Sequence, residues 1–325
     1  MKPELKPLFK DRMQLLLKDS KDFEEFQEII HKIPRNFIRC NTLKITPEKL
    51  MEKLNKKWEV IQPFKENPEI MLINSKLGPG DLGSSIEHVL GYYYVQEISS
   101  MMSGVALKPK AGELVFDMCA SPGSKSTQLS ASMENQGTLI TNDFKMDRII
   151  ILASNLERCG CSNTVITRMD GVQLCQRFQK TDMKFDKILL DVPCSGEGTL
   201  RSSAKTFLMW NPKMIKSLSR MQKKMIANAL KVLKVGGELV YSTCTHAPEE
   251  NEEVLDFAIK NFPIKIEKIS LPLKTRPGVT QWNGEKYDEQ VKNAHRIYPQ
   301  DNDSEGFFVA KIKLLEEIRE KEIEQ

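Results

Sequence analysis

The chain has 325 residues, of which 40% are hydrophobic, 28% charged and 7% aromatic, and its formal net charge is +4. These values exclude a disordered chain and are typical of one or two folded domains. No apolar run of about 18 residues occurs, which excludes a membrane-spanning helix. Residues 1–14 alternate charged with single apolar residues, so we expect no signal peptide and a cytoplasmic location.

Seven cysteines are spread along the chain. An odd number without a regular spacing is untypical of a secreted disulfide scaffold, so we expect free thiols. Cys159 and Cys161 stand close together, but no second ligand pair follows at zinc spacing. We therefore interpret this pair as part of a turn between a helix and a strand, and we predict no metal site.

The first part of the chain predicts a small α+β unit. Helical patterns extend to Ile33, apolar runs predict strands near Phe37–Leu43 and Ile70–Ile73, and a helix is expected around Lys44–Lys56. We place domain boundaries to give three segments, which are residues 1–107, residues 108–315 and an acidic tail at residues 316–325.

From Glu113 onward, short strands alternate with amphipathic helices such as Asp147–Arg158. The predicted strands are Glu113–Asp117, Thr138–Asp143, Asn163–Met169, Phe185–Asp191 and Glu238–Cys244. This alternation predicts an α/β fold, a Rossmann-like domain with a mostly parallel sheet and helices on both faces. Its ligands are expected beyond the carboxyl ends of the strands. Pro272–Gln290 predicts an irregular loop, and Phe307–Leu314 predicts a late strand.

A long helix is predicted after Trp210. Asn211 is suited to the N-cap and Pro212 to the first helical position, while Gly236 and Gly237 are expected to end the helix. Its apolar residues, methionines included, recur on one face, so we assign the methionines to the core.

Basic residues are concentrated in two regions. Residues 196–235 contain nine Lys or Arg and one acidic residue, and residues 1–57 contain 14 basic and 9 acidic residues. Such clusters favour a polyanionic partner, because phosphate neutralisation releases counterions. A solvated helix face is the alternative for each cluster taken alone.

Three predicted strands end in an aspartate. Asp117 begins a glycine-containing turn, residues 117–127, between a strand and a helix, where main-chain amides can approach a nucleotide-like ligand. The turn has neither P-loop nor G-x-G-x-x-G spacing. Asp143 ends the second strand, where an acid in such folds accepts hydrogen bonds from ribose hydroxyls, and Asp170 follows the third. Each aspartate singly is also explained as a helix cap.

Two cysteines follow the last two strands of this series. Cys194 lies in the segment DVPCSG and Cys244 in the segment YSTCT. A buried cysteine is usually structural, but the carboxyl ends of strands are where an α/β sheet binds its ligands. His246, two residues after Cys244, raises the alternative of a Cys–His dyad.

The motifs CASPGSKS, TND, RMDG, DVPCSG and KVGGELVYSTCTHAPEENEEV resemble those of the Sun/RsmB-type RNA cytosine-5 methyltransferases. The resemblance covers roughly residues 36–315 and includes RNFIRCNTLK, GYYYVQEISSMM and EGFFVAKI. Cysteines in both PCSG and STCT distinguish these RNA enzymes from DNA cytosine-5 methyltransferases. Ser124, Ser126 and Thr245 depart from the usual Gly, Thr and Ser, and we expect Ser124 to alter cofactor affinity slightly.

The resemblance implies a catalytic group. Cys244 is the expected nucleophile, which adds to carbon 6 of cytosine and so activates carbon 5. Asp191 is expected to protonate or hydrogen-bond N3, and the Pro193 carbonyl to accept from the N4 amine. Cys194 is expected to help remove the carbon 5 proton, so that Cys244 is released. Lys125 is expected to orient Asp191 or the base.

The resemblance also implies S-adenosylmethionine as the cofactor, bound by a class I methyltransferase domain. Asp143 is expected at the ribose, Asp170 at the adenine, Arg148 near the cofactor and Asp191 between cofactor and base. The loop expected around the methionine moiety consists of Cys119, Ala120, Ser121, Pro122, Gly123, Ser124 and Lys125.

RNA is the implied partner, with no membrane, no metal and a monomeric chain. We favour transfer RNA, because the chain resembles short archaeal members without long extensions, and ribosomal RNA is the alternative. The N-terminal unit is expected to select the RNA. An alternative of another class is a non-catalytic RNA-binding or ribosome-assembly factor on the same fold.

Overall fold

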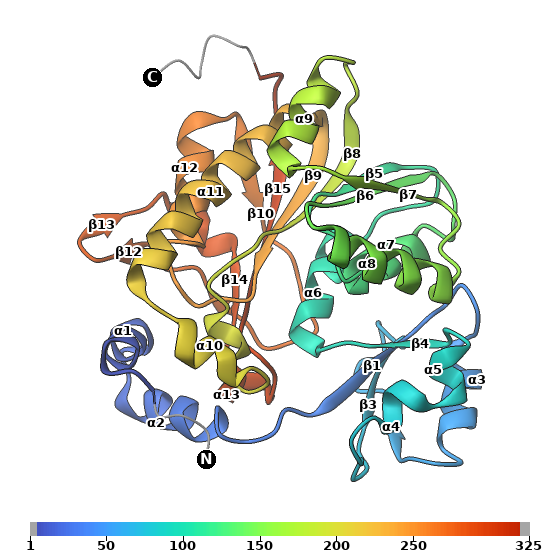
Figure 1. Ribbon diagram of the computed structural model, residues 1–325. Helices are drawn as coiled ribbons and strands as arrows, with labels where there is room; N and C mark the ends of the chain where they lie inside the picture. Colours follow the sequence, from blue (N-terminus) through green and yellow to red (C-terminus); the bar gives the residue numbers. More distant parts are fainter. Residues whose placement is uncertain (1–4, 319–325) are drawn as a thin grey trace.

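A nine-stranded mixed sheet forms the centre of the molecule in the computed structural model, which describes residues 5–318 (Figure 1). Five neighbouring strands run parallel in the order β9-β8-β5-β6-β7. They are β5 (Leu114–Asp117), β6 (Thr138–Asp143), β7 (Thr164–Arg168), β8 (Phe185–Asp191) and β9 (Leu233–Thr243). The five strands predicted from the sequence are confirmed, and β9 starts five residues earlier than expected.

The sheet continues beyond β9 with antiparallel strands. Phe307–Leu314, the predicted late strand, is β15 and pairs with β9. The further strands are β14 (His295–Ile297), β11 (Arg276–Pro277) and β10 (Ile264–Glu267). The region expected as an irregular loop holds β11, the short pair β12 (Gln281–Trp282) and β13 (Glu285–Lys286), and the start of the 3-10 helix η2 (Glu289–Asn293).

Helices cover both faces of the parallel part, as predicted (Figure 1). One face carries α6 (Ile98–Leu107) and α7 (Ser124–Ser132), with α8 (Met146–Cys159) packed beside α7. The other face carries α9 (Gly171–Gln179), α11 (Pro212–Lys231) and α12 (Glu252–Asn261). Alternate side chains of each strand point to opposite faces. Leu189 therefore packs in the cluster of α6, and Leu190 in the cluster of α11.

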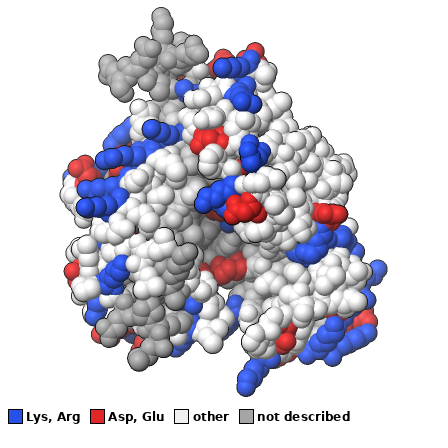
Figure 2. All heavy atoms as spheres, in the orientation of Figure 1, with Lys and Arg blue, Asp and Glu red and all other residues white. Residues whose placement is uncertain are grey.

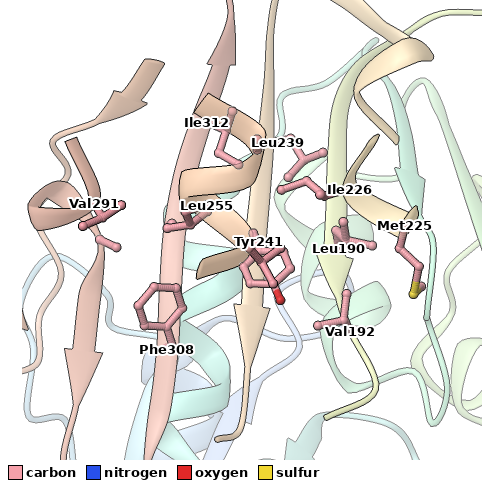
Figure 3. Close-up of a cluster of buried hydrophobic side chains, with 14 of the residues drawn as sticks. Leu190, Val192, Met225, Ile226, Leu239, Tyr241, Leu255, Val291, Phe308 and Ile312 are labelled. Atoms are coloured by element: carbon pink, nitrogen blue, oxygen red, sulfur yellow. The ribbon is translucent and has the colours of Figure 1, made fainter. Parts of the chain in front are cut away.

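Figure 3 shows the core on the α11 side. Leu190 and Tyr241 point from neighbouring strands toward Ile226 of α11 and Leu255 of α12, and all four are fully buried. Burying each such side chain contributes on the order of 1.5–3 kcal/mol. This packing fixes α11 against the ends of β8 and β9, where Cys194 and Cys244 follow.

The long helix agrees with the prediction at its start and differs at its end. Asn211 caps α11, since its side-chain oxygen accepts the Met214 N–H at 2.9 Å, and Pro212 is the first helical residue. The expected stop at Gly236 and Gly237 is wrong, because α11 ends at Lys231. Both glycines lie within β9, and the positive φ of Gly236 (78°) allows the chain to turn there.

The N-terminal unit contains a four-stranded antiparallel sheet in the order β2-β3-β1-β4. Its strands are β1 (Asn36–Cys40), β2 (Val60–Ile61), β3 (Ile70–Ile73) and β4 (Tyr93–Val95), and its helices are α3 (Pro47–Leu54), α4 (Asp81–Ser84) and α5 (Ile86–Val89). Ile38, Leu50, Leu54, Met71 and Tyr93 form its own core. The predicted strands and the predicted helix of this unit are present. β3 has the predicted bounds, β1 starts one residue earlier and ends three residues earlier than expected, and α3 is shorter at both ends.

The first two helices, α1 (Pro7–Leu17) and α2 (Ser20–Ile29), pack in the core cluster of the large sheet. Arg12 of α1 forms a bidentate ion pair with Glu249 at 2.8–2.9 Å, and α2 contacts α13 (Pro299–Asn302). The division of the chain at residues 107 and 108 stays a prediction. Most of the predicted acidic tail, from residue 319 on, lies outside the described residues.

Candidate active site

The order of the parallel strands reverses between β5 and β8. After β5 the chain continues to β6 and β7 on one side, and after β8 it continues to β9 on the other. The loops after β5 and β8 therefore diverge and leave a crevice, which is where open α/β sheets bind ligands. A cavity of about 720 Å³ lies there. Its wall includes Met118, Cys119, Ser121, Asn142, Asp143, Arg148, Asp170, Asp191, Pro193, Cys194, Met221, Met225 and Cys244.

The turn after β5 is held by main-chain contacts. The Ala120 N–H donates to the Asn142 carbonyl at 2.8 Å, and Gly123 precedes α7 with a φ of 104° that favours glycine. The Asp117 Oδ2 accepts from the Ser126 hydroxyl at 2.7 Å. Burial raises the pKa of Asp117 to about 7. Asp117 is thus a buried support of the turn and does not line the cavity.

Two arginines from different parts of the chain hold the same turn. Arg148 of α8 donates to the Ser121 carbonyl at 2.7 Å and lies 3.3 Å from the Asp143 carboxylate. Arg39 of β1 donates to the Ser124 carbonyl and to the Thr127 hydroxyl, both at 2.7 Å. Arg39 is buried, and burial lowers its pKa to about 10. The N-terminal unit therefore fixes the turn directly, which the sequence patterns did not indicate.

Asp143 and Asp170 both lie on the cavity wall, as predicted. Asp170 also caps α9, because its Oδ1 accepts the Gln173 N–H at 3.0 Å. Asp143 accepts the Lys145 N–H at 3.1 Å. The capping interpretation is therefore correct for Asp170, which also lines the cavity, and wrong for Asp143, because the N-cap of α8 is Lys145.

Asn142 is a further residue of this rim that had no predicted role. Its Nδ2 donates to the carbonyls of Met118 and Met169 at 3.2 and 3.0 Å, and its Oδ1 accepts the Met169 N–H at 3.1 Å. It thus ties together the turns that follow β5 and β7. The available signal was its position directly before Asp143 at the carboxyl end of a strand.

The Asp191 carboxylate is held from two sides. Lys125 donates to its Oδ2 and the Ser242 hydroxyl donates to its Oδ1, each at 2.7 Å. Ser242 in turn accepts from the Ser103 hydroxyl of α6 at 3.0 Å. Burial lowers the pKa of Lys125, but the Asp191 charge more than offsets this, so the pKa is raised overall and Lys125 stays charged. The predicted pairing of Lys125 with Asp191 is present.

Cys194 and Cys244, the two cysteines at the strand ends, are in direct contact. Cys194 Sγ and Cys244 Sγ lie 3.2 Å apart, although 50 residues separate them in the chain. The hydrogen bond with Cys244, together with burial, raises the pKa of Cys194 well above its ordinary value. Cys194 therefore holds its proton at neutral pH, and either sulfur of the pair can donate in this hydrogen bond. All seven cysteines are free thiols, as predicted.

His246 does not form the alternative dyad. Its ring stacks on Tyr298 at a centroid distance of 5.1 Å and meets the edge of Phe26. Burial lowers the pKa of His246 to about 3. No hydrogen bond joins His246 to Cys244 among the described residues, so it is a neutral core residue.

A second cavity of about 550 Å³ adjoins the first. Asp191, Val192 and Cys244 lie on the walls of both cavities. The second wall also contains residues 33–37 and 95–97, which belong to the N-terminal unit. Asp191 and Cys244 therefore border two cavities, one of which the N-terminal unit shapes.

The loop predicted to surround the cofactor divides between these cavities. Cys119 and Ser121 line the first cavity, while Pro122, Ser124 and Lys125 line the second. Ala120 and Gly123 are absent from both walls. Ala120 is buried against α8, and Gly123 supplies the turn. Three side chains of α11 reach the first cavity, which are Met221, Lys224 and Met225. The two methionines also pack in or against the core cluster, as the sequence predicted.

Basic side chains lie on both sides of this region. Lys213, Lys216, Arg220 and Lys224 of α11 are exposed. Figure 2 shows Lys and Arg gathered over α11 and over the N-terminal unit, with a hollow between them. Lys224 lines the first cavity, so the basic surface extends to the site. This distribution favours a polyanionic ligand that crosses both units.

Two family models match the chain. The model of the 16S rRNA methyltransferase RsmB/F matches residues 104–313, and the model of the N-terminal domain of 16S rRNA methyltransferase RsmF matches residues 5–98. This chain belongs to the RsmB/F family of RNA cytosine-5 methyltransferases. The resemblance found in the motifs is confirmed.

Curated RsmB/F relatives act on different RNAs. A tRNA (cytosine(49)-C(5))-methyltransferase of Pyrococcus abyssi is 43% identical over 293 residues, which cover 90% of this chain and 92% of that protein. The ribosomal RNA small subunit methyltransferase F of Psychromonas ingrahamii is 37% identical over 316 residues, which cover 96% of this chain. The chain spans 64% of the length of that bacterial relative.

Solved structures agree with the fold. A methyltransferase homolog from Pyrococcus horikoshii has a TM-score of 0.83 and 34% identity, and the match covers 95% of both chains. The NSun6 structure from the same organism has a TM-score of 0.81 at 23% identity, which shows the fold alone.

RsmB/F enzymes use S-adenosylmethionine, and the first cavity fits this cofactor. Its wall offers the carboxylates of Asp143 and Asp170, which suit the hydroxyl and amine donors of an adenosine. Met221 and Met225 add apolar surface on the opposite side. The carboxylates also suit a cationic sulfonium.

None of the helices within residues 5–318 is long and apolar enough to cross a membrane. No group of three or more His, Cys, Asp or Glu within this range is arranged to hold a metal ion. The absence of a metal stays a prediction.

Proposed function

We propose that this RsmB/F member methylates carbon 5 of a cytidine in transfer RNA through a covalent bond to Cys244. The observation that carries the proposal is the arrangement of Cys194 and Cys244, 3.2 Å apart, beside the Lys125–Asp191 ion pair. These groups lie where the two cavities meet. The cofactor-facing wall and the RNA-facing wall therefore share the reacting groups.

The first half of the reaction activates carbon 5. Cys244 Sγ forms a bond to carbon 6 as it gives up its proton, and the electron pair of the 5,6 double bond moves into the ring. The proton from Cys244 is taken up by Asp191 and passed to N3, so that no net charge builds up on the base. Lys125 and Ser242 hold Asp191 in place for this role. S-adenosylmethionine supplies an electrophilic methyl group when it is bound.

The second half restores the ring. With the methyl group on carbon 5, Cys194 gives up its own proton to solvent, and the resulting thiolate takes the remaining carbon 5 proton. The C–H electron pair reforms the double bond, and N3 returns its proton through Asp191. The bond between carbon 6 and Sγ breaks, and Cys244 leaves as a thiolate. Cys119, Ser121, Asp143, Arg148 and Asp170 are proposed to hold the cofactor, and they line the first cavity.

Transfer RNA is favoured over ribosomal RNA as the substrate. The Pyrococcus abyssi relative that acts on tRNA is matched over 92% of its length, whereas the bacterial ribosomal RNA enzymes extend well beyond the matched part. Ribosomal RNA is the second candidate, because both family models are named after 16S rRNA enzymes. The proximity of Asp191, Lys125 and both cysteines argues against a non-catalytic RNA-binding factor. A monomer in the cytoplasm stays a prediction.

The proposal is tested by incubating the protein and S-adenosylmethionine with unmodified transfer RNA and, separately, with ribosomal RNA. Mass spectrometry of the nucleosides should show 5-methylcytidine in transfer RNA, and Cys244→Ala should abolish it. Cys194→Ala should instead accumulate a protein–RNA adduct that survives a denaturing gel. Full activity of Cys244→Ala would refute the nucleophile, and methylation confined to ribosomal RNA would refute the substrate.

A further inference from the structure

Two buried polar residues behind the Cys194 turn have no role in the mechanism above. Gln222 of α11 and Glu250, which precedes α12, are both 0% exposed. A buried carboxylate and a buried amide cost free energy unless they are hydrogen-bonded. The hydrogen-bond partners of Gln222 and Glu250 therefore show which segment of the chain these two residues hold in place.

Both residues hold the main chain on the two sides of Cys194. The Glu250 Oε2 accepts the Ser195 N–H at 3.0 Å and the Gln222 amide N–H at 2.8 Å. The same Gln222 Nε2 donates to the Pro193 carbonyl at 3.0 Å. Tyr241 fixes the Glu250 main chain, because its hydroxyl donates to the Glu250 carbonyl at 2.6 Å.

We propose that Glu250 and Gln222 are positioning residues for Cys194 and set the rate at which the methylated base is released from Cys244. The proposal rests on the function proposed above and deepens it. It assigns a role to a glutamate of the segment 249–253 and to a glutamine of the long basic helix.

The need for such a support follows from the reaction. In the free protein, Cys194 Sγ is held by its hydrogen bond with Cys244. When Cys244 is bonded to carbon 6, its sulfur has no proton to donate and is a thioether, which is only a weak acceptor, so this hydrogen bond is weakened. The position of Cys194 then depends on the main-chain anchors at Pro193 and Ser195, and these anchors are Gln222 and Glu250.

Release of the methylated base from Cys244 requires Cys194 to stay in this position. The carbon 5 proton must leave with the help of Cys194, its electron pair must reform the 5,6 double bond, and Cys244 must leave as a thiolate. If Cys194 moves away, the bond between carbon 6 and Cys244 still forms but breaks slowly. The lifetime of the covalent adduct therefore reports the placement of Cys194 separately from general folding damage.

The test compares variants of the full chain on a tRNA transcript that the wild-type protein methylates. Glu250→Ala removes the shared acceptor, and Gln222→Met removes the amide donor at similar volume. Glu250→Gln is the conservative variant, because one amide oxygen can accept both N–H groups. Glu253→Ala is the matched control, since Glu253 pairs with Lys223 at 2.7 Å and its side chain is 36% exposed.

The measurement is the decay of the labelled protein–RNA band on a denaturing gel, with Cys194→Ala as the reference for a trapped adduct. We expect decay to be about tenfold slower in Glu250→Ala and Gln222→Met, because each variant loses two of the hydrogen bonds that hold the main chain beside Cys194. Glu250→Gln should stay within about threefold of wild type, and Glu253→Ala should match it.

Wild-type adduct decay in folded Glu250→Ala or Gln222→Met would overturn the proposal, as would lost methylation without any adduct. If Glu250→Ala fails to fold, Gln222→Met decides between slow and normal release. Failure of the underlying function would look different. In that case Cys194→Ala would trap nothing and Cys244→Ala would still methylate, and the positioning role would fall with it.

Discussion

Removal of the Ser242 hydroxyl should slow the reaction without loosening the cofactor. Ser242 is fully buried, and its hydroxyl donates to the Asp191 Oδ1 at 2.7 Å. In Ser242→Ala one carboxylate oxygen of Asp191 loses its partner, while the Lys125 ion pair remains on the other oxygen. Asp191 is then free to rotate away from the position from which it serves N3 of the base.

The magnitude follows from the hydrogen bond that is lost. A hydrogen bond to a charged group contributes about 1.5–3 kcal/mol, which corresponds to a roughly 10- to 150-fold lower kcat. Ser103→Ala is the matched comparison, because Ser103 donates to Ser242 at 3.0 Å and does not touch Asp191. A neutral hydrogen bond contributes about 1 kcal/mol, so this variant should lose no more than about fivefold.

The assay is single-turnover methylation of a tRNA transcript at saturating cofactor, with the cofactor Kd measured separately by calorimetry. We expect a lower rate constant and an unchanged cofactor Kd for Ser242→Ala. Urea unfolding checks that both variants are folded under the assay conditions. A rate within about threefold of wild type for folded Ser242→Ala would refute the role of Ser242, as would equal losses in the two variants.

Two further predictions concern the turn after β5. Arg39→Lys should weaken cofactor binding about tenfold, because a lysine cannot reproduce the paired bonds to Ser124 and Thr127; an unchanged Kd in the folded variant would contradict this. The pKa of Asp117 is about 7 in the folded protein, whereas its ordinary value is 3.8. At a pH between these two values, the side chain of Asp117 therefore takes up a proton when the protein folds. The unfolding free energy of wild type relative to Asp117→Asn should therefore fall by up to about 4 kcal/mol as the pH rises from 4 to 7, and parallel curves in urea titrations would refute it.

Local sequence was sufficient for elements whose partners are close in the chain. The strand runs 138–143, 185–191 and 307–314 were placed with their observed bounds, because β-rich apolar runs between turns depend mainly on burial. The cap of α11 followed from Asn211 and Pro212 for the same reason, since a cap bonds an amide three residues away. The motif residues at the strand ends followed from the resemblance of the segments that contain them.

Tertiary structure decided which buried polar groups meet. Arg39 reaches Ser124 across 85 residues, and the Glu250 acceptor for Ser195 lies 55 residues away. No local pattern indicates such pairs, because the cost of burying a polar group is offset by whichever partner the packing brings near. The wrong end assigned to α11 has a related cause. β9 pairs with β8 at Leu233 and again from Glu238 on, so Gly236 and Gly237 lie inside the strand between these pairs. A glycine signal alone cannot reveal that pairing. The sequence by itself determined the family, the strand order along the chain and the chemical groups, whereas the three-dimensional packing determined how those groups are held for reaction.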